Sequence, residues 1–194
     1  MNFLAHIYLS GDDDEVTLGN FFADGVKGKK YLNYPAKIQK GILLHRAIDS
    51  YTDAHPTVRQ STKRLHANYG HYSGVIVDIL YDHFLAKNWL DYCDKPLADY
   101  IDDFYEVLRS NYEILPTRTK RLMPYMIADN WLLSYASVKG ISTILAQMNV
   151  RTKNKSKMNL AVLELEEFYE EFEAEFRAFF SDLKAYSENK LSQL

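Results

Sequence analysis

The sequence contains a single cysteine, Cys93, among its 194 residues. One cysteine excludes an internal disulfide and a cysteine-based zinc site, and it fits a reduced compartment. No apolar run approaches the roughly 18 residues that a membrane-spanning helix needs. The formal net charge is −3, so the composition provides no overall basic surface for nucleic acid. We therefore expect a protein that binds neither membranes nor nucleic acid.

The opening segment also lacks the basic n-region of a signal peptide. Residues 1–9 are largely apolar, but they run directly into the acidic cluster Asp12–Glu15. This order of segments is not that of a secretory leader. Together with the lone cysteine, it predicts a cytoplasmic location.

The sequence is instead rich in apolar residues with helical periodicity. Its hydrophobic content of 47% and aromatic content of 14% argue against disorder. A chain of this length is expected to form one domain, residues 1–194, with a sizeable core. Nearly every periodic segment has helical spacing, and none alternates as a strand does. The predicted fold class is therefore all-α, a single-domain helical bundle.

Prolines, glycines and capping residues predict where the helices begin and end. Pro35, Pro56 and Pro96 are expected at helix starts, and Pro124 is expected to interrupt or open a helix. The predicted helices cover residues 2–9, 13–26, 35–52, 56–69, 73–92, 96–115, 124–148 and 158–189. The polar, basic segment 151–157 is predicted to be a loop.

Two helical segments carry ionisable side chains one turn apart. His45 and Asp49 share a face of one predicted helix, and Asp78 and Asp82 share a face of another. The second pair points where the core should lie, and buried carboxylates need partners or a metal. His45 and Asp49 are either a ligand pair or a surface pair of small energetic value.

Other residues near these pairs are further candidates for ligands or catalytic groups, with a less distinctive sequence pattern. Asn20 and Asp24 are also one turn apart, and Asp24 near a helix C-terminus is slightly unfavourable against the helix dipole. His6 lies on an apolar helix and is either a core histidine or part of a site. Arg46 can clamp a phosphate or remain a solvated charge. His83, beside Asp82, can be a ligand, a general acid or a group that orients a carboxylate.

These acids and histidines form a ligand set of nitrogen and oxygen without thiolate. Such a set suits Mn²⁺, Fe²⁺ or Zn²⁺, and suits Mg²⁺ alone less well. A metal of this kind polarises a phosphoryl oxygen and activates bound water. Carbonyl hydrolysis would use the same groups, so the spacing predicts a metal-dependent hydrolase without naming its substrate.

Four segments of the sequence resemble segments of the acyl carrier protein phosphodiesterase family. They are Met1–His6, Leu18–Gly28, Gly41–Asp49 and Val77–Leu85, and their order and spacing match the family, as does the chain length. The segment around Trp131 resembles a further family segment. The resemblance covers about the first 90 residues well and the remainder loosely.

This resemblance implies an all-helical, HD-domain-like phosphohydrolase. It implies removal of 4′-phosphopantetheine from holo-acyl carrier protein, by hydrolysis of the phosphodiester on the carrier's serine, with Mn²⁺ as a typical metal. The sequence has Asp82-His83 where an ordinary HD motif has the order His-Asp. Ligand roles therefore cannot be transferred from standard HD enzymes.

The residues and the resemblance together define the expected site. The expected metal ligands or their immediate supports are Asp24, His45, Asp49, Asp78 and Asp82. Arg46 is expected to neutralise the phosphoryl oxygens, and His83 or His6 to protonate the leaving serine oxygen. The carrier is small and acidic, so a local basic surface is expected to bind it. Residues predicted to contact substrate or partner are Asn20, Lys27, Lys29, Lys30 and Trp131.

Two other functions remain open from the sequence. A phosphohydrolase of small phosphorylated molecules or nucleotides would use the same groups, and the basic clusters would then be incidental. A non-catalytic helical binding module would instead satisfy its inward acids with Lys, Arg or Tyr side chains. The sequence gives no oligomeric state.

Overall fold

The computed structural model describes residues 1–194, and its regular elements are all helices. This confirms the predicted all-α fold. The α-helices are α1 (Phe3–Tyr8), α2 (Asp14–Phe22), α3 (Ala36–Ala54), α4 (Pro56–Tyr69), α5 (Ser73–Lys87), α6 (Leu97–Ser110), α7 (Thr117–Ala128), α8 (Trp131–Ser134), α9 (Val138–Arg151), α10 (Ala161–Glu167) and α11 (Tyr169–Gln193). Short 3₁₀ helices are η1 (Ala23–Gly25), η2 (Gly28–Asn33), η3 (Gly70–Tyr72), η4 (Trp89–Asp91), η5 (Tyr112–Ile114) and η6 (Met158–Leu160). None of these helices combines the length and apolar character needed to cross a bilayer.

Local signals predicted most helix ends, but they were wrong in the C-terminal half. Pro124 lies inside α7, and the left-handed backbone of Asn130 (φ 43°) separates α7 from α8. The single helix predicted over 158–189 is divided at Phe168, whose backbone leaves the helical region and whose ring packs against the core. Tertiary packing has overridden a continuous helical pattern at this point.

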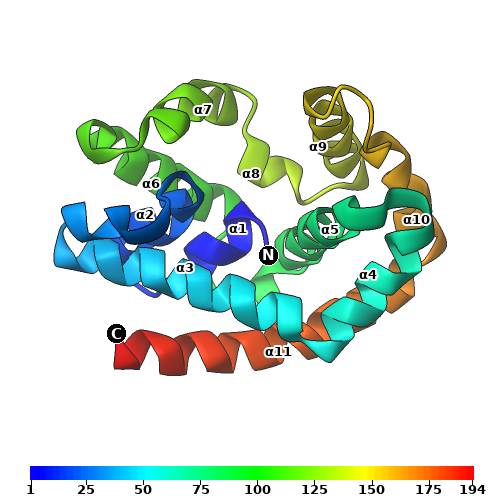
Figure 1. The fold of residues 1–194 in the computed structure, drawn as a ribbon, viewed down its shortest axis with the longest axis horizontal. Coiled ribbons are helices and arrows are strands. Elements are labelled where there is room, and N and C mark those ends of the chain that lie inside the picture. Colours follow the sequence, from blue (N-terminus) through cyan, green and yellow to red (C-terminus); the bar gives the residue numbers. More distant parts are fainter.

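The short helix α1 lies at the centre of the molecule, with the N-terminus beside it (Figure 1). It packs against α2 and α5, while α3 packs against α2 and α11. Figure 1 shows α7, α8 and α9 across one side and α11 along the opposite side. Aromatic side chains of α11, including Phe172, Phe176 and Phe180, are fully buried against the rest of the core. The core thus surrounds α1, which carries His6.

Two glycines allow the backbones of α2 and α3 to touch. A Cβ atom on Gly41 would lie 2.1 Å from the carbonyl oxygen of Val16, and a Cβ on Gly19 would lie 2.2 Å from that of Ile38. Real Cβ atoms do not approach backbone oxygen this closely, so only glycine fits at both positions. This contact sets the distance between α2, which carries Asn20, and α3, which carries His45.

We expect Gly41→Ala to destabilise the protein by about 3 kcal/mol, because the added methyl group overpacks a backbone contact that cannot relax. Gly74→Ala is the matched control, since nothing lies within 4 Å of a Cβ built there. In that variant the usual helix-propensity gain of alanine over glycine, roughly 1 kcal/mol, should appear as stabilisation. Urea unfolding followed by circular dichroism measures both effects. Equal stability of the two variants would contradict the proposed backbone contact.

Candidate metal centre

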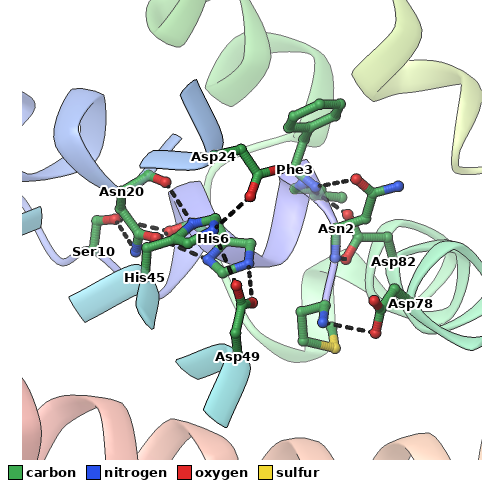
Figure 2. Close-up of polar contacts among 12 residues, drawn as sticks. Asn2, Phe3, His6, Ser10, Asn20, Asp24, His45, Asp49, Asp78 and Asp82 are labelled. Carbon is green, nitrogen blue, oxygen red and sulfur yellow. Dashed lines mark hydrogen bonds and ion pairs between the residues drawn. The ribbon is translucent and has the colours of Figure 1, made fainter. Parts of the chain in front are cut away.

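Side chains from α1, η1, α3 and α5 line one pocket of about 280 Å³. His6 comes from α1, Asp24 from η1, and His45 and Asp49 from α3, with Asn20 of α2 lying behind the histidines. Figure 2 shows the two imidazole rings side by side, with Asp49 on one side and Asp24 on the other. Only the His45–Asp49 pair is local in sequence.

The two histidines are stacked and share one carboxylate. Their ring centroids are 4.0 Å apart with an interplanar angle of 22°. Asp49 lies 3.3 Å from Nε2 of His6 and 3.1 Å from Nε2 of His45, through a different oxygen each time. Asp24 lies 3.4 Å from the same Nε2 of His45. Both imidazoles are buried, whereas the Asp49 and Asp24 side chains are 43% and 59% exposed, so the carboxylates form the open side of the pocket.

Asn20 fixes the orientation of both imidazoles. Its backbone carbonyl lies 2.8 Å from Nδ1 of His45, and its side-chain oxygen lies 2.8 Å from Nδ1 of His6. The Asn20 amide nitrogen donates to the carbonyl of His6 and to Ser10 Oγ, which identifies the oxygen as the atom facing His6. Each Nδ1 must therefore carry the hydrogen. In the neutral rings both Nε2 lone pairs then point into the pocket.

The chemistry of this group fits a divalent metal ion. His6, His45 and Asp49 each offer one ligand atom, and these atoms all lie within 4.8 Å of one another. Ligand atoms about 2.1 Å from a shared ion lie roughly 3 Å from one another, as the Asp49 contacts do. Nε2 of His45 is buried and has no hydrogen-bond partner of good geometry, although both carboxylates lie within 3.4 Å of it. A buried, unpartnered lone pair facing two carboxylates is the arrangement of a metal ligand.

The charges around the pocket favour a cation at the same point. Burial opposes the charge on His45, but Asp24 and Asp49 outweigh it and raise the pKa of the imidazole to about 9. Burial also opposes ionisation of Asp49, yet the two histidines hold the pKa of that carboxyl well below its usual range. Burial and the neighbouring His45 lower the pKa of His6. The pocket thus attracts one positive charge, which a metal ion supplies in place of a proton.

The structure does not bring Asp78 and Asp82 into this ligand group. Asp82 is fully buried and accepts hydrogen bonds from the backbone N–H groups of Asn2 (3.2 Å) and Leu4 (2.7 Å). Asp78 lines the pocket, but one of its oxygens pairs with the Met1 amino group at 2.8 Å. Both carboxylates on α5 therefore hold the N-terminal segment, as Figure 2 shows. They position His6 through α1, because the first backbone N–H groups of α1 have no hydrogen-bond partners inside the helix.

Burial raises the pKa of Asp82 to about 7, against the lowering effects of the Met1 amino group and the two backbone N–H donors. An unfolded aspartate titrates near 3.9, so between these values the folded state retains a proton that the unfolded state releases. Stability should therefore fall as the pH rises through this window. From pH 5 to pH 8 we expect this group to lower the free energy of unfolding by roughly 3 kcal/mol.

Asp82→Asn isolates this effect, because the amide does not titrate while the other groups of the site remain. Urea unfolding at several pH values, with a chelator present, should give a shallower pH dependence for the variant than for the wild-type protein. Equal slopes for the two proteins would contradict the raised pKa of Asp82.

Two other predicted catalytic residues lie outside the pocket. Arg46 donates hydrogen bonds to the carbonyl oxygens of Val26 (3.0 Å) and Gly28 (2.8 Å). It therefore holds the loop after Asp24 and does not face the candidate metal ligands. His83 is held at both nitrogens, with Nδ1 2.7 Å from the Tyr135 carbonyl and Nε2 2.7 Å from the Tyr169 hydroxyl. The contacts of Arg46 and His83 could not be predicted from the sequence, because each partner is distant along the chain.

The residues predicted to meet substrate or partner fall into three environments. Asn20 is fully buried behind the histidines, so it positions the site and does not contact a partner. Lys27, Lys29 and Lys30 are exposed on the loop that Arg46 holds. Trp131 is half-buried at the start of α8, and the guanidinium of Arg151 lies 5.4 Å from its ring centroid.

Two residues near the site were not assigned to it from the sequence. Arg118 lines a neighbouring cavity together with Asp24, and its charge helps to lower the pKa of Asp24 behind the larger effect of His45. Thr52 is 2% exposed and lines the metal pocket, and its hydroxyl has no hydrogen-bond partner. Thr52 follows Asp49 by three positions on α3, so helical spacing was a signal for it. Arg118 belongs to the basic cluster Arg118, Lys120 and Arg121, a candidate docking surface in the sequence, but its place beside Asp24 had no local signal.

Two imidazoles and two carboxylates around one pocket of an all-helical protein form a site that is consistent with a divalent cation, as in many metal-dependent hydrolases. Comparisons with known proteins narrow this class. The family model for acyl carrier protein phosphodiesterase matches residues 1–183. No solved structure matches the chain.

Curated relatives that match the chain over nearly their full length have the same family name. The chain is 34% identical over 181 residues to the acyl carrier protein phosphodiesterase of Pectobacterium atrosepticum, covering 93% of this chain and 94% of the relative. It is 33% identical over 195 residues to that of Photorhabdus laumondii, covering 98% and 96%. It is 31% identical over 191 residues to that of Yersinia enterocolitica, covering 98% and 99%. The chain belongs to the acyl carrier protein phosphodiesterase family, which confirms the predicted family and the phosphodiester hydrolase class.

Proposed function

We propose that this protein hydrolyses the phosphodiester that joins 4′-phosphopantetheine to the serine of holo-acyl carrier protein, releasing apo-carrier protein. The observation that carries the proposal is the group His6, His45 and Asp49, whose ligand atoms converge in one pocket. Family membership supplies the substrate class. Nitrogen and oxygen ligands without thiolate favour Mn²⁺, with Fe²⁺, Zn²⁺ and Mg²⁺ as alternatives.

When bound, the metal supplies Lewis acidity at the phosphoryl oxygens and activation of water. The chain's own residues do the rest. His6 and His45 present Nε2 toward the ion, and Asn20 keeps both rings in that tautomer. Asp49 completes the ligand group, and the more exposed Asp24 lies on the side open to substrate. Thr52 offers an unpartnered hydroxyl to a phosphoryl oxygen or an ordered water.

The direct test is to incubate metal-reconstituted protein with holo-acyl carrier protein and Mn²⁺, and to follow the carrier by intact-mass spectrometry. We expect loss of the whole phosphopantetheine mass, blocked by a chelator. A carrier of unchanged mass, with a folded helical protein that has bound metal, would overturn the proposed substrate. Hydrolysis of a small diester under those conditions would then favour a small-molecule phosphohydrolase.

The loop with Lys27, Lys29 and Lys30 is the proposed docking surface for the acidic carrier, because it is exposed and follows Asp24 directly. We expect Lys29→Glu/Lys30→Glu to raise KM for holo-carrier by about tenfold and to weaken its salt dependence. Turnover of a small phosphodiester should be unchanged. The control is Lys184→Glu/Lys190→Glu on α11, which makes the same charge change elsewhere. Equal effects of both double variants would exclude specific docking at this loop.

A further inference from the structure

A narrow passage leads away from the metal pocket beneath α8 and α9. Its volume is about 170 Å³, and it shares Asn2, Phe3, Asp24 and Val75 with the pocket. The Phe3 ring points away from Asp49 (Figure 2), and Phe3 lines the passage. The passage and the pocket therefore adjoin, and Asp24 is one of the residues that line both.

The walls of the passage are mostly apolar. Beyond Phe3 and Val75, Ile144 and Met148 of α9 line it together with Tyr135. The Tyr135 side chain is only 2% exposed, and its backbone carbonyl is held by His83. This wall is therefore fixed by the packing behind it, where His83 in turn contacts Tyr169. A preformed apolar passage beside a polar pocket is a common form of ligand site.

At its far end the passage opens into a wide groove between α7 and α9. The groove has a volume of about 740 Å³ and shares Arg118, Trp131, Gln147 and Arg151 with the passage. The metal pocket, the passage and the groove thus follow one another, each sharing lining residues with the next. The residues that line the passage or the groove, but not the metal pocket, have no role in the proposed hydrolysis.

We infer that this passage receives the pantetheine arm of the substrate and directs its thiol end into the wide groove. The inference rests on the proposed function, and it adds the location of the arm. The arm is an extended chain in which one methylene group separates the phosphate ester oxygen from a dimethyl-substituted carbon, followed by a hydroxyl group and two amides. With the phosphate at the metal group, the methyl groups meet Phe3 and Val75, which removes apolar surface from water.

The chemistry of the far end fits the rest of the arm. Gln147, at the junction with the groove, offers both a donor and an acceptor to an amide. Trp131 provides an apolar face at the exit. A volume of about 170 Å³ is far too small for a folded protein, so the carrier stays outside while its arm lies along the passage. Binding energy along the arm then positions the phosphodiester at the metal group.

Filling the passage without touching the metal group tests this inference. Ile144→Trp places a large ring in the passage, and Ala146→Trp is the control on the exposed side of the same helix. Each protein is assayed with Mn²⁺ on holo-carrier protein and on bis(p-nitrophenyl) phosphate, and pantetheine binding is measured by calorimetry. Met148→Trp is the second passage variant if the first is unstable.

We expect Ile144→Trp to lower kcat/KM for holo-carrier by about tenfold or more and to abolish pantetheine binding. Hydrolysis of the small diester, which does not enter the passage, should remain within about twofold of wild type for both variants. Unchanged holo-carrier hydrolysis in folded Ile144→Trp and Met148→Trp would overturn the location of the arm while leaving the proposed function intact. If the wild-type protein does not act on holo-carrier, the proposed function fails. Pantetheine binding that Ile144→Trp abolishes would still support the passage in that case.

Discussion

Asp49→Ala is expected to abolish phosphodiester hydrolysis, with kcat/KM lowered by about three orders of magnitude or more. Asp49 is the one carboxylate that contacts both histidines, at 3.3 and 3.1 Å. Removing it deletes an anionic ligand, leaves the buried His6 without a carboxylate and leaves His45 with Asp24 alone. The protein should also lose stoichiometric Mn²⁺, which can be measured by equilibrium dialysis with metal analysis.

Ser50→Ala is the matched control for this prediction. Ser50 is the next residue on α3 and is exposed, so its removal should leave metal content and turnover unchanged. An Asp49→Ala protein that keeps its metal and retains activity within about tenfold of wild type would remove Asp49 from the proposed ligand group.

Asn20→Leu is expected to have the second largest effect. The leucine preserves size, but it removes the acceptor for Nδ1 of His6 and two donated hydrogen bonds, to the His6 carbonyl and to Ser10. Loss of a group that orients a metal-binding histidine typically costs about 10- to 100-fold in metal affinity or activity. We expect a loss of about 100-fold in kcat/KM and about 3 kcal/mol in stability.

A purely structural role for Asn20 would give a different pattern. Ser10→Ala also removes buried hydrogen bonds of this network, but it leaves the Asn20 oxygen facing Nδ1 of His6. We expect it to lower stability with a much smaller effect on Mn²⁺ affinity. Nitrogen chemical shifts of the His6 ring report the tautomer directly. If Asn20→Leu leaves both the His6 tautomer and the Mn²⁺ affinity unchanged, Asn20 does not position the site.

The C-terminal half shows where helical periodicity was insufficient. The apolar pattern continues through Phe168 and past Pro124, yet the chain turns near the first and stays helical through the second. Periodicity reports which face is apolar, and it does not report where a neighbouring helix requires the chain to change direction. The wide groove lies between α7 and α9, on either side of the break at Asn130, which the apolar pattern did not predict.

The acidic pairs show the same limit within the site. Helical spacing correctly placed Asp78 and Asp82 on one face of a helix, and burial of a carboxylate correctly demanded a partner. The partners are the Met1 amino group and backbone N–H groups of α1, which lie 77 to 80 residues away in the sequence. Backbone N–H donors are present at the start of every helix whatever its residues are. The sequence therefore does not indicate which of them pair with a buried carboxylate. The metal was therefore the more obvious partner from the sequence, although the structure provides another.

The sequence by itself determined the helical class, the family and the local pair His45 and Asp49, because these depend on residue order, composition and spacing within one helix. Only the tertiary structure decided that His6 joins this pair, that Asn20 sets both tautomers, and that Asp82 holds α1. These three relations link helices that the glycine contact between α2 and α3 and the N-terminal hydrogen bonds bring together. Their distances depend on packing between elements far apart in the chain, and spacing along one helix carries no information about it.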